Sequence, residues 1–402
     1  MLLKINIYKI FFLILFLSSM FIGSIRVAIG PIRLDLIFEL IILFYLIVFK
    51  KIYYKKTVQN LWIFLPFMIY FIFSCLFITK DISIKDILFI IMPIYAALCY
   101  YILSYLSFKI NLKFLNSLLK VFILINFIFV IFQYFNLFNT NAYLSSYYTY
   151  LSINNSTVDM TKIIQQRASG LVGNPTFLTF LVYLMYKIKN IIKPEIKITI
   201  LVLLTMLISG GRMVLLFTVI WEAFEYIHKN LTKFKNKKHL MHNICKVTLF
   251  IIGGLISIIL IIRFVPFLYE QVWQPIENAS LFSAESYTWR GQMYKMLASQ
   301  EIPTFIFGGK SYLVLSKLQI TAFDSEYVLR ILQFGLLGLF FMYLPLIYFS
   351  VKNRFEIFSV FPLALCLTIS ITNFTITNYT FIFYIILYVI LYNKYVTRSY
   401  IL

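Results

Sequence analysis

The sequence predicts an all-α, polytopic integral membrane protein with about twelve transmembrane helices, and its composition is the first reason. Of the 402 residues, 61% are hydrophobic and only 13% are charged, whereas a soluble domain is nearer half apolar and a quarter charged. The mean hydropathy is +0.89. Aromatic residues make up 19% of the chain, which suits side chains that pack against lipid and anchor at its interfaces. This composition excludes an ordinary soluble enzyme and a disordered polar chain.

The lengths of the apolar segments are the second reason. A helix needs about 20 mostly apolar residues to cross the hydrocarbon core. The segments that meet this requirement lie near residues 6–25, 34–49, 61–79, 86–107, 114–137, 170–188, 196–210, 212–228, 247–265, 326–350, 355–372 and 378–394. We therefore expect residues 1–402 to form a single transmembrane domain.

The third reason is the distribution of charge. The net charge is +21, which in a soluble protein would suggest nucleic acid as a partner. Here the lysines concentrate in short connections between apolar segments, so the expected partner is the lipid bilayer and not nucleic acid. With both termini in the cytoplasm, every cytoplasmic connection is basic, as the positive-inside rule requires.

Two connections on the opposite side are long, at residues 138–169 and 266–325. Long loops within a compact fold are usually functional, so we expect the chemistry to face away from the cytoplasm. In the larger loop, Trp289, Met293, Met296 and Leu297 share one helical face. This spacing predicts a short amphipathic helix at the membrane surface.

Arginines gather on this outer side, whereas lysines dominate the inner side. A guanidinium group is a planar fork of donors that suits phosphate. Arg212 follows Ser209-Gly210-Gly211 at a tight junction between two predicted helices, where a helix N-terminus favours an anion. Arg167 precedes Asn174-Pro175 at the start of another helix, and Arg290 lies in the larger loop. Each of them alone is explained as well by snorkelling to lipid headgroups, but three on one side favour a pyrophosphate site.

Asp324 is the outer carboxylate that directly precedes a predicted membrane helix. Three roles are open for it: general base, acceptor for a sugar hydroxyl, or helix cap. Glu326 lies in the first turn, where compensation of the helix dipole alone would explain it; Glu285 is the reserve base. The histidines are all cytoplasmic in this topology, and the four cysteines form no CxxC pair. We therefore predict neither a metal site nor a cofactor.

The order of these motifs resembles the O-antigen polymerase and O-antigen ligase superfamily, which includes the Wzy-type polymerases. The resemblance rests on the segment from Arg167 to Pro175, the Ser209–Arg212 junction, the long loop with Arg290, and Phe307-Gly308-Gly309 followed by Asp324-Ser325-Glu326-Tyr327, Gly335 and Gly338. Gly211 departs from the family's Ser-x-Ser-Arg junction. Ligases of this superfamily use a histidine in the large external loop, and residues 266–325 contain none, which favours a polymerase.

The resemblance implies a metal-independent membrane glycosyltransferase of the C type in the bacterial cytoplasmic (inner) membrane. Its substrates would be undecaprenyl-pyrophosphate-linked oligosaccharides, polymerised into O-antigen, capsule or exopolysaccharide, with a chain-length regulator and a flippase as further partners. Arg167, Arg212 and Arg290, with Ser209 and Asn174, would bind the pyrophosphate, and Asp324 would activate the attacking hydroxyl. An O-antigen ligase is the alternative within enzymes. A flippase or transporter of lipid-linked oligosaccharides is the alternative from another class, but its charges would lie nearer the bilayer midplane.

Overall fold

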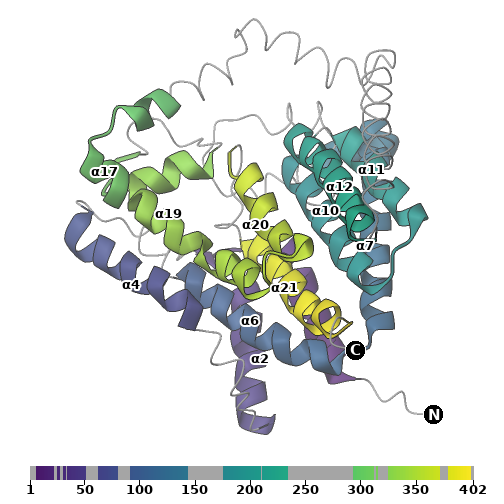
Figure 1. Ribbon diagram of the computed structural model, residues 1–402. Helices are drawn as coiled ribbons and strands as arrows, with labels where there is room; N and C mark the ends of the chain where they lie inside the picture. Colours follow the sequence, from purple (N-terminus) through teal and green to yellow (C-terminus); the bar gives the residue numbers. More distant parts are fainter. Residues whose placement is uncertain are drawn as a thin grey trace, which may run out of the picture.

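The structure is a computed structural model that describes residues 6–21, 25–27, 30–32, 34–50, 62–79, 91–143, 175–209, 211–233, 293–311, 314–315, 325–371 and 379–399. Nearly all of these residues are helical (Figure 1). The elements in chain order are α1 (Ile7–Phe21), β1 (Ile25–Val27), β2 (Gly30–Ile32), α2 (Leu34–Lys50), η1 (Trp62–Phe64), α4 (Leu65–Phe73), η2 (Ser74–Ile78), α6 (Ile91–Lys109), α7 (Leu112–Tyr134), η3 (Leu137–Asn139), α10 (Pro175–Ile192), α11 (Ile196–Ser209), α12 (Arg212–Lys233), α17 (Ile302–Phe307), α19 (Glu326–Lys352), α20 (Ile357–Ile369) and α21 (Tyr379–Ser399).

Three helices, α6, α7 and α19, are long and apolar enough to cross a membrane. Shorter apolar helical stretches in the described residues are Ile7–Ser19, Leu36–Phe49, Trp62–Ile78, Ile196–Ser209, Ile357–Ile369 and Phe381–Tyr395. The predicted all-α, membrane-embedded architecture is therefore confirmed, apart from a small antiparallel hairpin of β1 and β2 between α1 and α2. Helices occupy the predicted spans except 247–265, which lies outside the described residues, and the number of spans stays a prediction.

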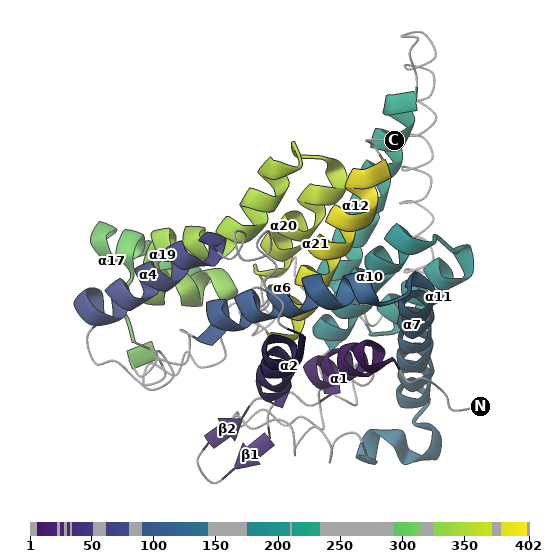
Figure 2. The ribbon, with the colours of Figure 1, turned by 90° about the horizontal axis from the view of Figure 1, so that it is seen from below.

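The helices form three groups that lie side by side (Figures 1 and 2). In Figure 1, α4, α17 and α19 lie on the left, α6, α20 and α21 in the middle, and α7, α10, α11 and α12 on the right. The groups are joined where α19 packs on α20, α21 on α10, and α12 on α20. The β1–β2 hairpin projects beyond α1 and α2 in Figure 2.

The centre of the fold is made by α10 and α21, which are apolar on nearly all sides. Their described side chains are buried without interruption over residues 178–189 and 381–392, as expected for helices enclosed by other helices. The rings of Phe180 and Phe381 lie 4.1 Å apart between the two helices. The Tyr384 hydroxyl donates to the Phe16 carbonyl at 2.9 Å, which joins α1 to this centre.

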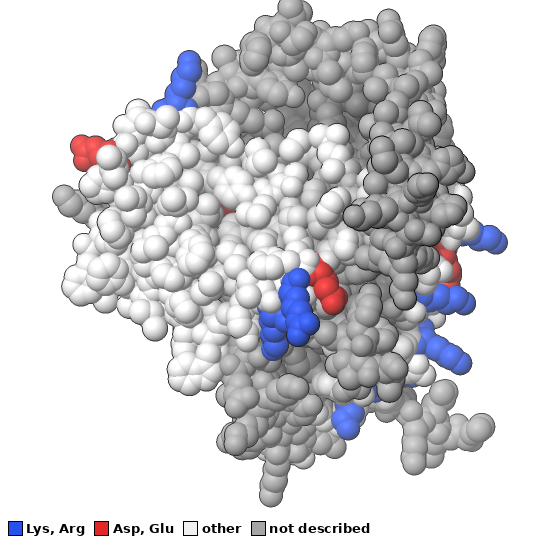
Figure 3. Space-filling view, in the orientation of Figure 1, with Lys and Arg blue, Asp and Glu red and all other residues white. Residues whose placement is uncertain are grey.

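The outer surface of the bundle is rich in exposed apolar side chains. Phe44 and Phe77, for example, are 66% and 74% exposed. The face in Figure 3 is uncharged over most of its described area, and most of its charged side chains lie toward the edge. Such a surface is suited to lipid rather than to water.

Contacts between helix ends divide the molecule into two sides. Lys9, at the start of α1, lies over the ring of Phe114 at the start of α7. Lys120 of α7 pairs with Glu195 in the α10–α11 turn at 2.7 Å. The Lys394 ammonium, near the end of α21, donates to the Ser107 carbonyl at the end of α6. We call this the lysine-rich side.

The opposite side holds the starts of α10, α12, α19 and α21 and the end of α20. The rings of Phe177 and Phe381, at the starts of α10 and α21, lie 5.0 Å apart. The Glu326 amide at the start of α19 donates to the Ser370 carbonyl at the end of α20. This alternation agrees with the order of the predicted connections. Which side faces the cytoplasm stays a prediction.

Candidate functional site

Most of the site residues predicted from the sequence lie outside the described residues: Arg167, Asn174, Arg290 and Asp324. Arg212 is the first residue of α12. Ser209 is the last residue of α11; it is fully buried, and its hydroxyl donates to the Thr205 carbonyl at 2.6 Å. The predicted junction between two helices is therefore present, and it lies on the side opposite the lysine-rich side.

Gly211 allows this junction to lie directly against α10. A Cβ at Gly211 would be 2.1 Å from Thr179 Oγ1, so only glycine permits this approach. Because Thr179 lies four residues after the start of α10 at Pro175, the N-terminal ends of α10 and α12 are neighbours. Helix N-termini carry unsatisfied N–H groups and a partial positive charge, so two of them together favour an anion.

The first half of α19 carries a buried polar stripe. Glu326, Arg330 and Gln333 are spaced at i, i+4 and i+7, so they share one helical face. None of the three is more than 4% exposed. The Arg330 Nη1 donates to Gln333 Oε1 at 2.5 Å. Charged side chains in a membrane helix usually face the protein interior and mark a functional site.

Glu326 is held by the end of α20. Ser370 Oγ donates to Glu326 Oε2 at 2.7 Å, and the Tyr343 hydroxyl lies 2.6 Å from the same Ser370 Oγ. Glu326 is thus not a solvated carboxylate that only compensates the helix dipole. We call Glu326, Arg330, Gln333, Tyr343 and Ser370 the Glu326 cluster.

The large loop contacts the residues next to this cluster through Tyr294. Residues 293–298 are helical, and Met293 and Leu297 are buried against the core. On the other face of the turn, the Tyr294 hydroxyl lies 3.3 Å from Ser325 Oγ and 3.4 Å from the Ile371 carbonyl oxygen. Tyr294 follows Arg290 by four residues, and Ser325 follows Asp324 directly. This contact therefore joins the segment that follows Arg290 in the sequence to the residue that follows Asp324.

A break in α19 explains the glycine motif of the loop. Gly335 interrupts the helix with φ +70° and ψ 178°. The Gly309 and Lys310 amides donate to the Gln333 and Leu332 carbonyls at 3.0 and 3.1 Å.

The backbone after α17 crosses α19 at its break, and Gly308 and Gly335 are both required there by close contact. A Cβ at Gly308 would lie 2.4 Å from the Gln333 carbonyl oxygen, and one at Gly335 would lie 2.1 Å from that of Ile306. The Tyr70 hydroxyl links the two backbones, because it donates to the carbonyls of Phe307 and Phe334. The two backbones thus satisfy each other inside the bundle.

A second polar cluster joins α10 to α12; Lys187 and Glu225 are buried in it, whereas the Glu222 side chain is 38% exposed. Lys187 Nζ lies 2.5 Å from Glu222 Oε1 and 2.6 Å from Glu225 Oε1. The Tyr183 hydroxyl donates to Glu222, and the Trp221 indole donates to Glu225. These contacts join side chains of α10 and α12 to one another, which is the pattern of a structural ion cluster.

The sequence reasoning missed Gln333, Tyr343, Ser370 and Tyr294. The spacing of Glu326, Arg330 and Gln333 was the available signal, because three polar residues on one face of an apolar helix require an interior partner. Ser370 and Tyr343 carried no such signal, since they join the cluster only through the tertiary packing of α19 on α20.

No family model, curated protein or solved structure matches this chain. Among the described residues, no three His, Cys, Asp or Glu side chains come together as a metal site would require.

Proposed function

We propose that this chain polymerises lipid-linked oligosaccharide repeat units at the extracytoplasmic face of the bacterial cytoplasmic membrane. The growing glycan would be transferred from undecaprenyl pyrophosphate to a sugar hydroxyl of the next repeat unit. In this reaction the hydroxyl oxygen forms a bond to the anomeric carbon, and the bond from that carbon to the pyrophosphate oxygen breaks. The hydroxyl proton passes to a base.

The observation that carries this proposal is the contact between Tyr294 and Ser325 above the buried Glu326 cluster. It brings the segment after Arg290 to the residue after Asp324. A guanidinium for the leaving pyrophosphate and a carboxylate for the attacking hydroxyl are the two groups that the transfer needs. The N-terminus of α12 begins at Arg212, and that of α10 follows Asn174. The two N-termini are neighbours on the same side of the bundle as the Tyr294–Ser325 contact, and both favour a pyrophosphate there.

In this proposal Arg167, Arg212 and Arg290, with Ser209 and Asn174, bind the pyrophosphate, and Asp324 is the base. Glu326 is a positioning residue. Its carboxylate accepts a hydrogen bond from Ser370, whose hydroxyl also contacts that of Tyr343, and these contacts fix the start of α19, the helix that Asp324 precedes in the sequence, on the end of α20.

The break in α19 supports an enzyme over a transporter. Transporters use broken helices because the freed carbonyls coordinate an ion or substrate. In α19 the carbonyls of Leu332, Gln333 and Phe334 accept hydrogen bonds from Lys310, Gly309 and Tyr70. These carbonyls at the break are thus hydrogen-bonded by the protein's own donors, so the break allows close packing of the backbones and does not form an ion or substrate site.

The test is elongation of a defined lipid-linked repeat unit by the purified protein in vesicles, followed on a gel. Wild type should produce a ladder of lengthening chains. Arg212→Ala and Arg290→Ala should each abolish the ladder at normal membrane abundance. The matched control is Arg354→Ala, which removes an exposed arginine on the lysine-rich side and should leave the ladder unchanged.

Two results would contradict the proposal. Normal elongation by both Arg212→Ala and Arg290→Ala would remove the pyrophosphate site. Transfer of finished glycan to a lipid or protein acceptor, without lengthening, would identify the ligase alternative instead.

A further inference from the structure

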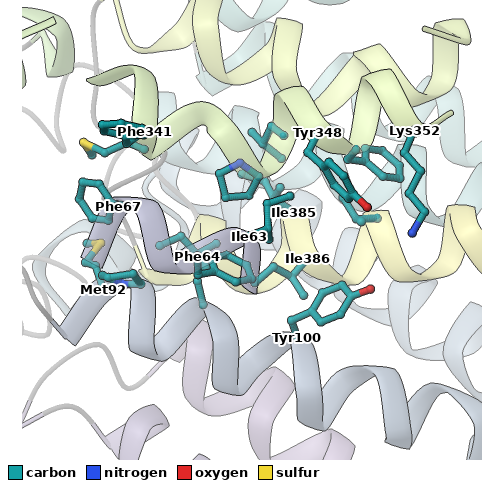
Figure 4. Close-up of a pocket in the computed structure, with 18 of the residues that line it drawn as sticks. Ile63, Phe64, Phe67, Met92, Tyr100, Phe341, Tyr348, Lys352, Ile385 and Ile386 are labelled. Atoms are coloured by element: carbon teal, nitrogen blue, oxygen red, sulfur yellow. The ribbon is translucent and has the colours of Figure 1, made fainter. Parts of the chain in front are cut away.

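A long apolar groove runs along the second half of α19, between η1, α4, α6 and α21. Its volume is about 1060 Å³ including its open mouth. Figure 4 shows Phe67, Met92 and Phe341 at one end and Ile63, Phe64, Ile385 and Ile386 along its length. It is separate from the Glu326 cluster, because none of the five residues of that cluster lines it.

The groove exists because small or ring-closed residues face it. Pro93 and Ala96 of α6 and Pro345 of α19 all line it. Pro345 lies inside α19, where its ring removes a hydrogen bond and prevents straight, close packing of the helix. A groove with such apolar walls does not hold ordered water. In a bilayer, the hydrocarbon chains of lipids are the molecules available to occupy it.

The polar groups of the groove gather at one end. Lys352, Tyr348 and Tyr100 lie toward the right of Figure 4, away from Phe67, Met92 and Phe341. The Lys352 ammonium also lies over the Tyr348 ring, 5.6 Å from its centroid. This is the lysine-rich side, where Arg354 is also exposed and Glu356 accepts a hydrogen bond from Tyr392.

The groove has the length of one leaflet. Phe341 and Lys352 are separated by eleven residues of helix, which corresponds to about 16 Å. The hydrocarbon core of a bilayer is about 30 Å thick, so an occupant that starts at Lys352 ends near the midplane. A chain with one charged end therefore fits better than a molecule that is apolar throughout.

We infer that the groove binds one acyl chain of an anionic phospholipid, with the lipid phosphate beside Lys352. A lysine ammonium is a compact charge with three donors and suits a phosphate oxygen, and the tyrosine hydroxyls add donors beside it. The polyprenyl carrier of the proposed reaction is not this occupant, because its pyrophosphate would lie at the opposite side. The inference does not depend on the proposed function.

The experiment is native mass spectrometry of the purified full-length protein in detergent. Phosphatidylglycerol and phosphatidylcholine with the same acyl chains are the two probes. We expect one phosphatidylglycerol to be retained per chain in preference to phosphatidylcholine. Lys352→Ala should weaken its binding by about tenfold, as expected for loss of one charge-assisted contact.

Two further variants separate the charge from the groove. Ala96→Leu narrows the groove but keeps Lys352, and it should also lower the retention of phosphatidylglycerol. Lys113→Ala removes an exposed lysine at the start of α7, outside the groove, and should leave the retention unchanged. Far-UV circular dichroism and gel filtration check that each variant is folded.

Three results would overturn the inference. Equal retention of the two lipids would make the groove a general hydrocarbon pocket. Wild-type retention by both Lys352→Ala and Ala96→Leu would place the lipid elsewhere. An equal loss of phosphatidylglycerol retention in Lys113→Ala and Lys352→Ala would mean that the overall charge of the protein, and not the position of Lys352, determines binding.

Discussion

Ser370 is the residue on which several groups at the start of α19 converge. Its hydroxyl donates to Glu326 and lies beside the Tyr343 hydroxyl, while its carbonyl accepts from the Glu326 amide. A buried polar group that loses a partner costs about 1–3 kcal/mol. The hydroxyl therefore has a larger effect on stability than its size suggests.

We expect Ser370→Ala to lower the free energy of unfolding by about 1–3 kcal/mol. Reversible unfolding in mixed detergent measures this directly. The control is Ser299→Ala, which removes an exposed hydroxyl that donates to the Met296 carbonyl and should change stability by less than about 0.5 kcal/mol. Equal effects of the two variants would mean that the cluster is not a stabilising unit.

Glu195 gives the molecule one pH-dependent contact outside the membrane spans. The hydrogen bond from Lys120 holds the pKa of this carboxyl below its usual value, because it favours the charged form. A carboxyl whose pKa is lowered in the folded state stabilises that state above its unfolded pKa, and the effect is lost as the pH falls through the folded value.

We therefore expect Glu195→Gln to lower the melting temperature slightly at pH 7. The difference from wild type should shrink below about pH 4. Glu301→Gln, which removes an exposed carboxylate from another part of the chain, is the control for the loss of one negative charge. A difference for Glu195→Gln that persists in acid would exclude the ion pair as its cause.

At the scale of the element, α19 combines two helices across one glycine. Gly335 adopts a backbone conformation that is open only to glycine, and the loop backbone at Ile306 lies too close for a Cβ. The sequence pattern predicted a continuous span over 326–350, because hydropathy does not register a single break. The glycine-rich motif of the loop is visible in the sequence, but its partner in α19 was not predictable, since the two are brought together only by folding.

We expect Gly335→Ala to destabilise the protein by about 3 kcal/mol or more, from backbone strain and the clash with Ile306. Membrane abundance and the melting temperature in detergent should both fall. Leu336→Ala changes the next residue, whose side chain is exposed, and should cost less than about 1 kcal/mol. A wild-type melting temperature for Gly335→Ala would show that the crossing is not tightly packed.

The pairing of α10 with α12 depends on Lys187. Removing this lysine leaves the buried Glu225 without its cation, and breaking a buried pair in this way costs about 3–5 kcal/mol, whereas the partly exposed Glu222 adds little to the loss. Lys187→Met should therefore be strongly destabilised in a denaturation assay. Adding Glu222→Gln and Glu225→Gln should recover most of the loss, because no uncompensated charge then remains. No recovery in the triple variant would mean that Lys187 acts by packing alone.

At the scale of the whole molecule, composition and apolar length predicted the helical membrane architecture well. The site was predicted less completely. The motif around Arg212 was correctly assigned to a tight junction between helices, but the approach that Gly211 permits is to Thr179 of α10. Contacts such as that of Tyr294 with Ser325 join residues 31 positions apart and depend on how the loop folds back, which no local pattern contains.

The two sides of the bundle allow the orientation to be tested by labelling. Cys75, Cys99 and Cys366 are buried, so a Cys245→Ser background should react little with a membrane-impermeant maleimide. Ser299→Cys, on the loop beside the Glu326 cluster, should react in right-side-out vesicles. Lys113→Cys, on the lysine-rich side, should react only after detergent opens them, because the positive-inside rule places lysine-rich connections in the cytoplasm. The reverse pattern would mean that the topology is inverted and would exclude an extracytoplasmic reaction. Labelling of both Ser299→Cys and Lys113→Cys in sealed vesicles would contradict the division of the molecule into two sides.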